Sequence, residues 1–260
     1  SRSPQLHGYW LEHYGIDGAY LPLPVRPEHL SAALAALPKL GFAGVNLTVP
    51  HKEAALPLMA ELDPLARRIG AVNTVVVRGD GTLKGSNTDA YGVEKCLDDG
   101  APQWRRAGVA MILGAGGAAR AVVAALIAGG IADIRLVNRS RDRATALARD
   151  LGGPIAVFDW DQRARALEGV KLLVNSTTLG MTGQPPLELA LDPLDPAAIV
   201  LDLVYAPLET ELLRSARLRG LTAVDGLGML LHQARPGFAA WFGRDPEVTP
   251  ELRAAVLAAG

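Results

Sequence analysis

A glycine-rich turn between an apolar strand and a helix constrains the fold of this chain more than any other feature. Val109–Leu113 is a short apolar run typical of a buried strand, and residues 118–128 are rich in helix-forming alanine. Between them, the spacing Gly114-x-Gly116-x-x-Ala119 permits a tight turn and a close approach to the backbone. A pyrophosphate can then meet the start of the helix, so the turn predicts dinucleotide binding. The alternative is a purely structural turn that packs the helix on the strand.

Apolar strands alternate with alanine- and leucine-rich helical stretches along the whole chain, which predicts an α/β fold with parallel sheets. In the first third we expect helices at residues 27–37 and 53–69, strands at 44–49 and 72–77, and a hairpin return at 82–85. Beyond the glycine turn, the expected strands are residues 134–137, 155–158, 172–175, 199–203 and 222–224. Strands separated by helices or loops in this way form a doubly wound sheet.

This pattern divides the chain into three parts. Residues 1–89 form a first α/β domain, and residues 90–225 form a Rossmann-like domain around the glycine turn. Residues 226–260 are helical and lie beyond the last strand, so we expect these C-terminal helices to return to the first domain.

The residues after the second strand of the Rossmann-like domain indicate which dinucleotide is bound. In NAD(H)-binding proteins, an Asp or Glu at this position usually binds the ribose 2′-hydroxyl. This chain instead has Asn138, followed by Arg139, Arg141 and Arg143. Guanidinium groups hold phosphate well, and arginines at a helix start oppose the helix dipole unless an anion is present. The residues favour NADP(H) over NAD(H), although arginines that merely face water remain the alternative.

Small polar residues follow the strands of the first domain. Asn46 and Thr48 should lie on one face of their strand, and Asn73 and the Asn87-Thr88 pair add further amides and hydroxyls. Such groups suit a hydroxylated ligand, because each hydroxyl needs a hydrogen-bond partner once it loses water.

Lys52 and Asp89 are the ionisable pair of this cluster that suits acid–base chemistry. When a hydride reaches a ketone, a lysine can protonate the developing alkoxide, and a carboxylate can keep that lysine charged. Such assistance is typically worth about 10²–10⁴-fold in rate. The alternative is a surface ion pair worth at most about 1 kcal/mol, and the two residues alone leave both interpretations open.

Composition narrows the class of partner. With 26 basic and 27 acidic residues, the net charge of −1 offers little attraction for nucleic acid or an anionic membrane. No apolar stretch reaches the roughly 18–20 residues that span a bilayer, and no signal peptide is expected. The single cysteine, Cys96, cannot form an internal disulfide, and the histidines show no metal-ligand spacing. We expect a cytoplasmic protein that acts on a small molecule and binds no metal.

Seven motifs occur in order along the whole chain. They are Ser1-x-Ser3-Pro4-x-x-His7, Asn46-x-Thr48-Val49-Pro50-His51-Lys52, Gly70-Ala71-Val72-Asn73-Thr74, Asn87-Thr88-Asp89, Gly114-Ala115-Gly116-Gly117-Ala118, Asn138-Arg139-Ser140 and Asp225-Gly226-Leu227-Gly228-Met229-Leu230-x-x-Gln233. As an ordered set they resemble the shikimate dehydrogenase family. The resemblance implies NADP-dependent interconversion of 3-dehydroshikimate and shikimate, a step of aromatic amino-acid biosynthesis. It also implies an N-terminal substrate domain, an NADP-binding domain, and C-terminal helices on the substrate domain.

The resemblance also implies roles for individual residues. Lys52 and Asp89 would be the catalytic pair, with Lys52 in the acid–base role. The substrate would contact Ser1, Ser3, Asn46, Thr48, Lys52, Asn73, Asp89, Tyr205 and Gln233. The cofactor would contact Gly114, Ala115, Gly116, Gly117, Ala118, Asn138, Arg139 and Arg143, with Thr177, Leu203 and Gly226 near the nicotinamide. Two departures stand out: the family has a strand and a Gly-x-Pro segment before the first motif, where this sequence begins, and Gly8 replaces a usual Asn.

Two alternative functions remain. A quinate/shikimate dehydrogenase of broader specificity shares the fold and the catalytic pair but often uses NAD, and Arg139 and Arg143 argue against it. A non-catalytic NADP-binding module would tolerate the loss of Lys52 or Asp89, and both are present. For the oligomeric state we expect a monomer or a homodimer.

Overall fold

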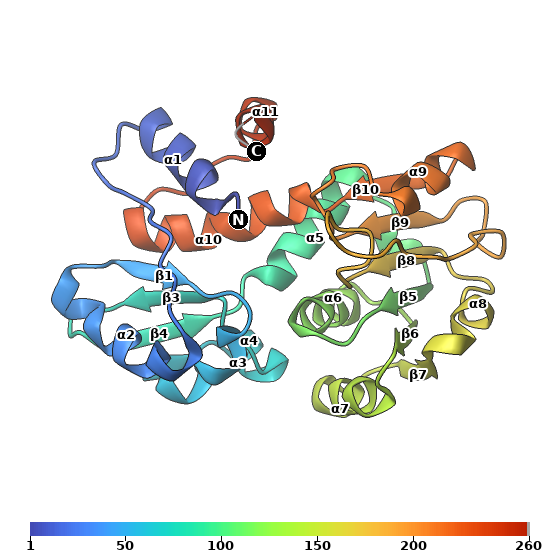
Figure 1. Ribbon diagram of the computed structural model, residues 1–260, viewed down its shortest axis with the longest axis horizontal. Coiled ribbons are helices and arrows are strands. Elements are labelled where there is room, and N and C mark those ends of the chain that lie inside the picture. The colour runs from blue at the N-terminus through green and yellow to red at the C-terminus, as the bar shows by residue number, and fades with distance from the viewer. Residues whose placement is uncertain (259–260) are drawn as a thin grey trace. The chain divides into compact units, whose positions relative to one another are not determined.

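The computed structural model describes residues 1–258 and divides into two compact units. The first unit contains Ser1–Thr88 and the chain from Leu230 onward, and the second unit contains Asp89–Met229 (Figure 1). The first unit is therefore assembled from both ends of the chain.

The first unit has a four-stranded sheet in the order β1-β3-β4-β2. Its strands are β1 (Gly44–Asn46), β2 (Glu61–Leu62), β3 (Thr74–Val77) and β4 (Leu83–Ser86). β3 pairs antiparallel with β1 and β4, whereas β2 pairs parallel with β4. Its short helices are α2 (Leu30–Ala36), α3 (His51–Ala54) and α4 (Pro64–Ile69). Side chains of α2 and α4, with Val72, Val75 and Leu83, form an apolar core.

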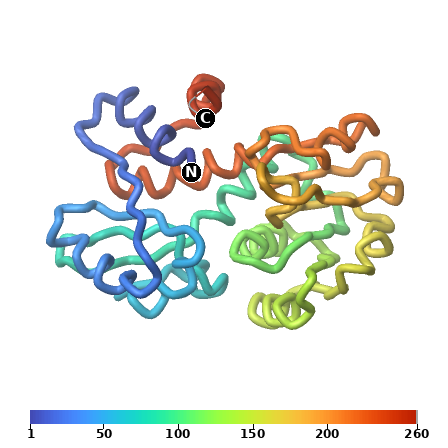
Figure 2. Tube along the Cα trace, in the orientation of Figure 1, coloured from blue at the N-terminus to red at the C-terminus, as the bar shows by residue number. Residues whose placement is uncertain are grey.

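Three further helices complete the first unit: α1 (Ser3–His13), α10 (Leu227–Phe242), which begins in the second unit, and α11 (Pro250–Ala258). α1 packs against α11, so the blue and red ends of the chain lie side by side (Figure 2). The Trp10 indole of α1 donates to the Glu247 carbonyl at 3.0 Å, and the Trp241 indole of α10 donates to the Val75 carbonyl of β3 at 3.0 Å. The C-terminal helices thus return to the first unit, as the sequence predicts.

The second unit has a six-stranded, fully parallel sheet in the order β10-β9-β8-β5-β6-β7. Its strands are β5 (Val109–Leu113), β6 (Asp133–Asn138), β7 (Ile155–Asp159), β8 (Leu172–Asn175), β9 (Ile199–Asp202) and β10 (Thr222–Asp225). Its helices are α5 (Asp89–Gly100), α6 (Gly117–Ala128), α7 (Arg141–Leu151), α8 (Arg163–Ala166) and α9 (Glu211–Leu218). Every residue of β8 and β9 is buried, as expected of parallel strands covered on both faces. The strand order reverses between β5 and β8, which is the doubly wound arrangement of the prediction.

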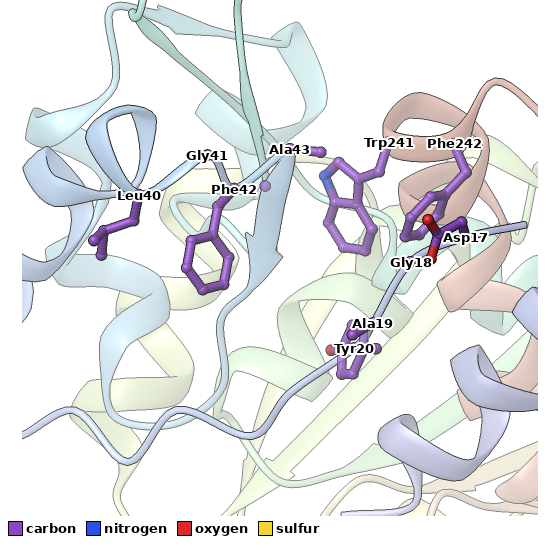
Figure 3. A pocket seen from close by; sticks show the side chains of 11 residues that line it. Asp17, Gly18, Ala19, Tyr20, Leu40, Gly41, Phe42, Ala43, Trp241 and Phe242 are labelled. Carbon is purple, nitrogen blue, oxygen red and sulfur yellow. The ribbon is translucent and has the colours of Figure 1, made fainter.

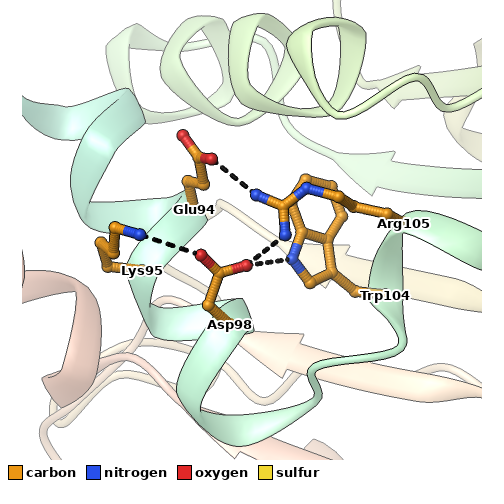
Figure 4. Close-up of polar contacts among 5 residues, drawn as sticks. All are labelled: Glu94, Lys95, Asp98, Trp104 and Arg105. Carbon is orange, nitrogen blue, oxygen red and sulfur yellow. Dashed lines mark hydrogen bonds and ion pairs between the residues drawn. The ribbon is translucent and has the colours of Figure 1, made fainter.

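A cluster of charges ties the end of α5 to the turn before β5 (Figure 4). The Asp98 carboxylate accepts hydrogen bonds from Lys95 at 3.2 Å, from the Trp104 indole at 2.9 Å and from Arg105. Arg105 also pairs with Glu94 at 2.6 Å. Partial burial raises the pKa of Asp98, but hydrogen bonds from Arg105, Trp104 and Lys95 outweigh it and hold the pKa at about 2.

Two local predictions are wrong for backbone reasons, and one helix was not predicted. Residues 53–69 do not form one helix, because prolines interrupt the segment and α4 begins anew at Pro64, capped by the Asp63 side chain. β1 ends at Asn46 rather than at residue 49, because the chain turns before the cis Val49-Pro50 bond. α1 is absent from the predicted elements; Pro4 stands in its first turn, where a missing N–H costs nothing.

Candidate active site

In the first unit, polar side chains from β1, β3 and α10 form one connected cluster. The Tyr20 hydroxyl donates to Asn46 Oδ1 at 2.9 Å. Asn46 Nδ2 in turn donates to the Asn73 carbonyl and to Thr74 Oγ1, at 3.1 Å each. Asn73 Nδ2 donates to Gln233 Oε1 at 3.3 Å. Three predicted substrate residues, Asn46, Asn73 and Gln233, are thus brought together although they are far apart in the sequence.

Asn73 is the centre of this cluster. It is buried, and its Oδ1 accepts from the Thr88 amide at 2.8 Å and from Thr74 Oγ1 at 3.0 Å. Its Nδ2 also donates to Thr88 Oγ1 at 3.0 Å. Because the amide is held from both ends, its orientation is set before any ligand arrives.

Tyr20 extends the cluster to the N-terminal serines. A side-chain hydrogen bond joins Tyr20 to Ser3, and Ser1 Oγ lies 3.2 Å from Ser3 Oγ. The Tyr20 ring stacks on His7 at 4.0 Å, and burial raises the pKa of Tyr20 to about 12. Tyr20 is not among the predicted site residues, because it lies in an irregular segment and only its tertiary contacts mark it.

Thr48 and Lys52 lie just beyond β1. β1 ends at Asn46 and Thr48 is exposed beyond it, so the prediction that the two share a strand face is wrong. The Thr48 carbonyl accepts from the His51 amide at 2.8 Å, while the His51 ring contacts the Val25 carbonyl at 2.9 Å. Lys52 is half-buried in the first turn of α3, and its carbonyl accepts from the Val72 amide at 2.8 Å. These bonds anchor the helix that carries Lys52 next to β3.

A groove of about 370 Å³ opens beside β1 in the first unit (Figure 3). It is lined by Asp17–Tyr20, Leu40–Gly44, Trp241 and Phe242. Its walls are polar and apolar in nearly equal parts, and none of the predicted site residues lines it. Tyr20 lines the groove and also belongs to the polar cluster.

Two predicted substrate residues belong to the second unit. Asp89 is buried and is the first residue of α5. Tyr205 is half-buried and follows β9.

The glycine turn after β5 fits a pyrophosphate. Gly114 has φ +107°, and an added Cβ would lie 2.8 Å from Ser176 Oγ, so only glycine is suited to that position. An added Cβ at Gly116 or Gly117 would meet no protein atom within 4 Å. α6 starts at Gly117 without a side-chain cap, so its first amides are available to an anion.

The arginines after β6 differ in their partners. Arg141 pairs with Asp159 at 2.6 Å, so the expectation that all three arginines require an external anion is wrong for this one. Arg139 and Arg143 are exposed and make no ion pair within residues 1–258. Asn138 ends β6, and its side chain donates to the Ser140 carbonyl at 2.8 Å. Two free guanidinium groups and no carboxylate at the strand end fit a 2′-phosphate.

The residues predicted near the nicotinamide meet at the ends of β8, β9 and β10. Thr177 Oγ1 donates to Asn175 Oδ1 at 2.7 Å, and the Leu203 amide donates to the Asn175 carbonyl at 2.9 Å. An added Cβ at Gly226 would lie 2.3 Å from the Leu203 carbonyl oxygen. Glycine is therefore required for β10 to end this close to β9.

Known family models match three stretches of the chain. Residues 1–75 match the shikimate dehydrogenase substrate binding domain, residues 101–181 match shikimate / quinate 5-dehydrogenase, and residues 226–257 match the shikimate 5′-dehydrogenase C-terminal domain. A shikimate dehydrogenase (NADP(+)) of Paramagnetospirillum magneticum is 64% identical over 258 residues, which cover 99% of this chain and 94% of that protein. The chain belongs to the shikimate dehydrogenase family.

Other relatives agree with this assignment. The shikimate dehydrogenase (NADP(+)) of Rhodospirillum rubrum is 60% identical, covering 99% of this chain and 93% of that protein. Shikimate 5-dehydrogenase from Thermus thermophilus, solved with NADP(H) and shikimate, has a TM-score of 0.86 at 37% identity and covers 100% of this chain and 95% of its own. Quinate dehydrogenase from Corynebacterium glutamicum, solved with NAD, has a TM-score of 0.91 at 32% identity and covers 99% and 94%. The predicted family and fold class are confirmed.

Within residues 1–258, no helix is both long enough and apolar enough to cross a bilayer. In the same part of the chain, no three His, Cys, Asp or Glu side chains gather in a way that could hold a metal ion.

Proposed function

We propose that this chain catalyses the reversible reduction of 3-dehydroshikimate to shikimate with NADPH, in the pathway to chorismate and the aromatic amino acids. The observation that carries the proposal is the 64% identity to a shikimate dehydrogenase (NADP(+)), which extends through both units. The names of the curated relatives agree with the predicted oxidoreductase class, reaction and cofactor.

The two units divide the work. The first unit, with the C-terminal helices, binds the substrate through neutral amides and hydroxyls of Ser1, Ser3, Asn46, Asn73 and Gln233, with Thr48 and Tyr20 as further contacts. Tyr205 of the second unit is proposed as a substrate contact from its motif position. Neutral donors and acceptors suit a ring with several hydroxyls, because each can replace the water that a hydroxyl loses. The connected cluster around Asn73 supports this role.

The second unit binds NADP(H), which supplies the hydride that is gained or lost at the substrate carbon when the cofactor is bound. Amides of the turn from Gly114 to Ala118 hold the pyrophosphate, while Arg139 and Arg143 hold the 2′-phosphate beside Asn138. Thr177, Leu203 and Gly226 shape the nicotinamide end. The open space at Gly116 and Gly117 and the two unpaired arginines support these assignments.

Lys52 and Asp89 perform the proton chemistry. In the reductive direction, the Lys52 ammonium donates a proton to the oxygen that gains negative charge, and in the oxidative direction the amine accepts it back. Asp89 is the second member of the catalytic pair. These roles rest on the motif positions, and the anchoring of α3 through the Lys52 carbonyl supports a fixed place for the lysine.

The runner-up function is a quinate/shikimate dehydrogenase that uses NAD. The likeness to quinate dehydrogenase from Corynebacterium glutamicum favours it, with a TM-score of 0.91. The chain's own residues favour NADP, because Asn138 replaces the acid that NAD prefers, and Arg139 and Arg143 make no ion pair in the described part of the chain. A non-catalytic module would have no need for both Lys52 and Asp89. We further propose a cytoplasmic monomer or homodimer, which light scattering on the purified protein tests for mass.

An absorbance assay at about 340 nm tests the proposal, with shikimate or quinate and with NADP⁺ or NAD⁺ in all four combinations. We expect rapid reduction of the cofactor only with shikimate and NADP⁺. Comparable rates with quinate and NAD⁺ would instead establish the broader-specificity enzyme. Binding of NADP⁺ without turnover of either substrate would establish the non-catalytic module.

A further inference from the structure

A buried polar network joins the ends of β8 and β9, and the assignments above leave its centre unused. Asn175 and Asp202 are paired in the sheet register, and Asn175 Nδ2 donates to Asp202 Oδ1 at 2.9 Å. Thr210 Oγ1 donates to Asp202 Oδ2 at 2.6 Å. Asn175 and Asp202 are 0% exposed and Thr210 is 2% exposed. Solvent therefore does not share in these bonds.

Asp202 has hydrogen bonds but no counter-ion. Besides Asn175 and Thr210, the Val204 amide donates to Asp202 Oδ1 at 3.0 Å. Within residues 1–258, no lysine, arginine or histidine pairs with this carboxylate. Burial raises the pKa of Asp202, and the hydrogen bonds from Thr210, Val204 and Asn175 oppose that rise. A buried carboxylate without a cation is costly, and an asparagine of the same shape would avoid that cost. We therefore look for a function of the negative charge of Asp202.

The network determines the course of two loops. Asn175 Oδ1 accepts from the Thr177 amide at 3.0 Å, and Asn175 Nδ2 also donates to the Leu179 carbonyl at 3.2 Å. On the other strand, Asp202 holds the Val204 amide, and Thr210 caps α9 by accepting from the Leu213 amide at 3.3 Å. Residues 176–179 and 203–210 are thus fixed from one buried centre.

The position in the sheet indicates what these loops face. In doubly wound sheets, a dinucleotide lies across the carboxyl ends of the strands where the strand order reverses, here between β5 and β8. The glycine turn follows β5 and the unpaired arginines follow β6, so the phosphates and the adenosine fall on that side. The ends of β8 and β9 are left for the nicotinamide. Its ring carries a positive charge only in the oxidised cofactor.

We propose that Asp202 is a positioning residue for the nicotinamide half of the cofactor: through Asn175 and Thr210 it holds the two loops, and its negative charge favours oxidised over reduced NADP. This inference rests on the proposed function, because it takes NADP(H) as the ligand of the second unit.

The charge is tested with Asp202→Asn, which keeps the shape of the side chain and one acceptor oxygen, while an amide nitrogen replaces the other oxygen. Dissociation constants are measured for NADP⁺ by calorimetry and for NADPH by its fluorescence. We expect NADP⁺ binding to weaken about 10-fold and NADPH binding to change by less than about 3-fold, because only the oxidised ring interacts with the lost charge. Adenosine 2′,5′-bisphosphate, which contains no nicotinamide, should bind as tightly as it does to the native protein. Equal weakening for NADP⁺ and NADPH, or none, overturns the role of the charge.

The loop contacts are tested with Thr210→Val and its conservative counterpart Thr210→Ser, which also serve if Asp202→Asn does not fold. We expect Thr210→Val to weaken NADP⁺ and NADPH alike by about 3-fold, and Thr210→Ser to restore both. Unchanged affinities in Thr210→Val overturn the positioning role.

The native protein separates this inference from the function on which it rests. If the native chain binds neither NADP(H) nor adenosine 2′,5′-bisphosphate, the proposed function fails and the inference fails with it. If both bind, but Asp202→Asn leaves the ratio of NADP⁺ to NADPH affinity unchanged and Thr210→Val leaves both affinities unchanged, only the inference fails.

Discussion

The two units build their polar sites in opposite ways. In the first unit, neutral side chains bond to one another: Asn73 alone joins Thr74, Thr88 and Gln233. In the second unit, the glycine turn offers backbone amides with no side-chain cap, and Arg139 and Arg143 have no ion-pair partner within residues 1–258. A preformed neutral cluster suits a ligand whose hydroxyls exchange hydrogen bonds to water for hydrogen bonds to the protein. Backbone donors and cations without a protein partner suit phosphate.

The units also differ in what acid does to them. All five histidines of the sequence fall in the first unit, and His7 is fully buried there. It lies among aromatic rings, with Tyr20 stacked at 4.0 Å and the Trp10 ring edge-on at 5.8 Å. Burial lowers the pKa of His7 from 6.5 to about 3. The second unit contains no histidine, so acid sensitivity near pH 5 should arise in the first unit.

Lys52 is the charged exception in the neutral site of the first unit, and its removal should have the largest effect. We expect Lys52→Ala to lower kcat about 10³-fold with little change in KM, because the ammonium acts mainly on charge that develops in the transition state. Steady-state kinetics with shikimate and NADP⁺ measure both constants. Lys84→Ala, at an exposed lysine paired with Glu61, is the matched control and should leave them unchanged. A rise in KM at constant kcat would assign Lys52 to binding alone.

Substitution of His7 tests whether the loss of folding stability in acid arises in the first unit. Its folded-state pKa lies below the ordinary value, so the unfolded chain takes up a proton below pH 6.5 while the folded chain does not until about pH 3. Stability is therefore lost as pH falls through this window, by roughly 3 kcal/mol at pH 4. Urea unfolding at pH 7 and pH 4 should show this loss in the native protein and a much smaller one in His7→Phe. The same slope in both proteins would contradict this origin, and exposed His29→Phe should leave the slope as in the native protein.

The arginines after β6 test whether the second unit binds phosphate through cations that have no ion-pair partner. We expect Arg139→Gln and Arg143→Gln each to raise the KM for NADP⁺ by about 10-fold, because each removes a charge-assisted bond to the 2′-phosphate. Arg141→Gln is the matched control, since Arg141 already pairs with Asp159, and it should change this KM by less than about 2-fold. Parallel assays with NAD⁺ should show no change for any of the three. A larger effect from Arg141 than from its neighbours would reverse the assignment.

The smallest effect should come from the charge cluster at the end of α5. Asp98→Asn weakens the bonds to Lys95 and Arg105, which we expect to lower the free energy of unfolding by about 1 kcal/mol. Thermal unfolding measures the loss, with exposed Asp161→Asn as the control. Because the cluster is structural, kcat and both KM values should remain as in the native protein. A changed KM for NADP⁺ would show that the cluster also acts on the cofactor site.

Local signals made much of the second unit predictable. β5 and β8 have the predicted bounds, because apolar runs are properties of adjacent residues. The glycine turn was equally predictable, since its backbone conformation requires glycine at Gly114. The first unit was harder: prolines divide residues 53–69, and the short β1 and β2 carry almost no periodic signal.

The sequence by itself determined the α/β class, the doubly wound fold and the preference for NADP, and it named most of the residues of the proposed site. These properties depend on residue type and short spacings, which act locally along the chain. Only the tertiary structure decided that Tyr20 joins the polar cluster, that Arg141 pairs with Asp159, and that Asp202 is buried without a cation from residues 1–258. Each of these depends on residues from different elements, and such contacts exist only once the strands are paired and the helices are packed on them.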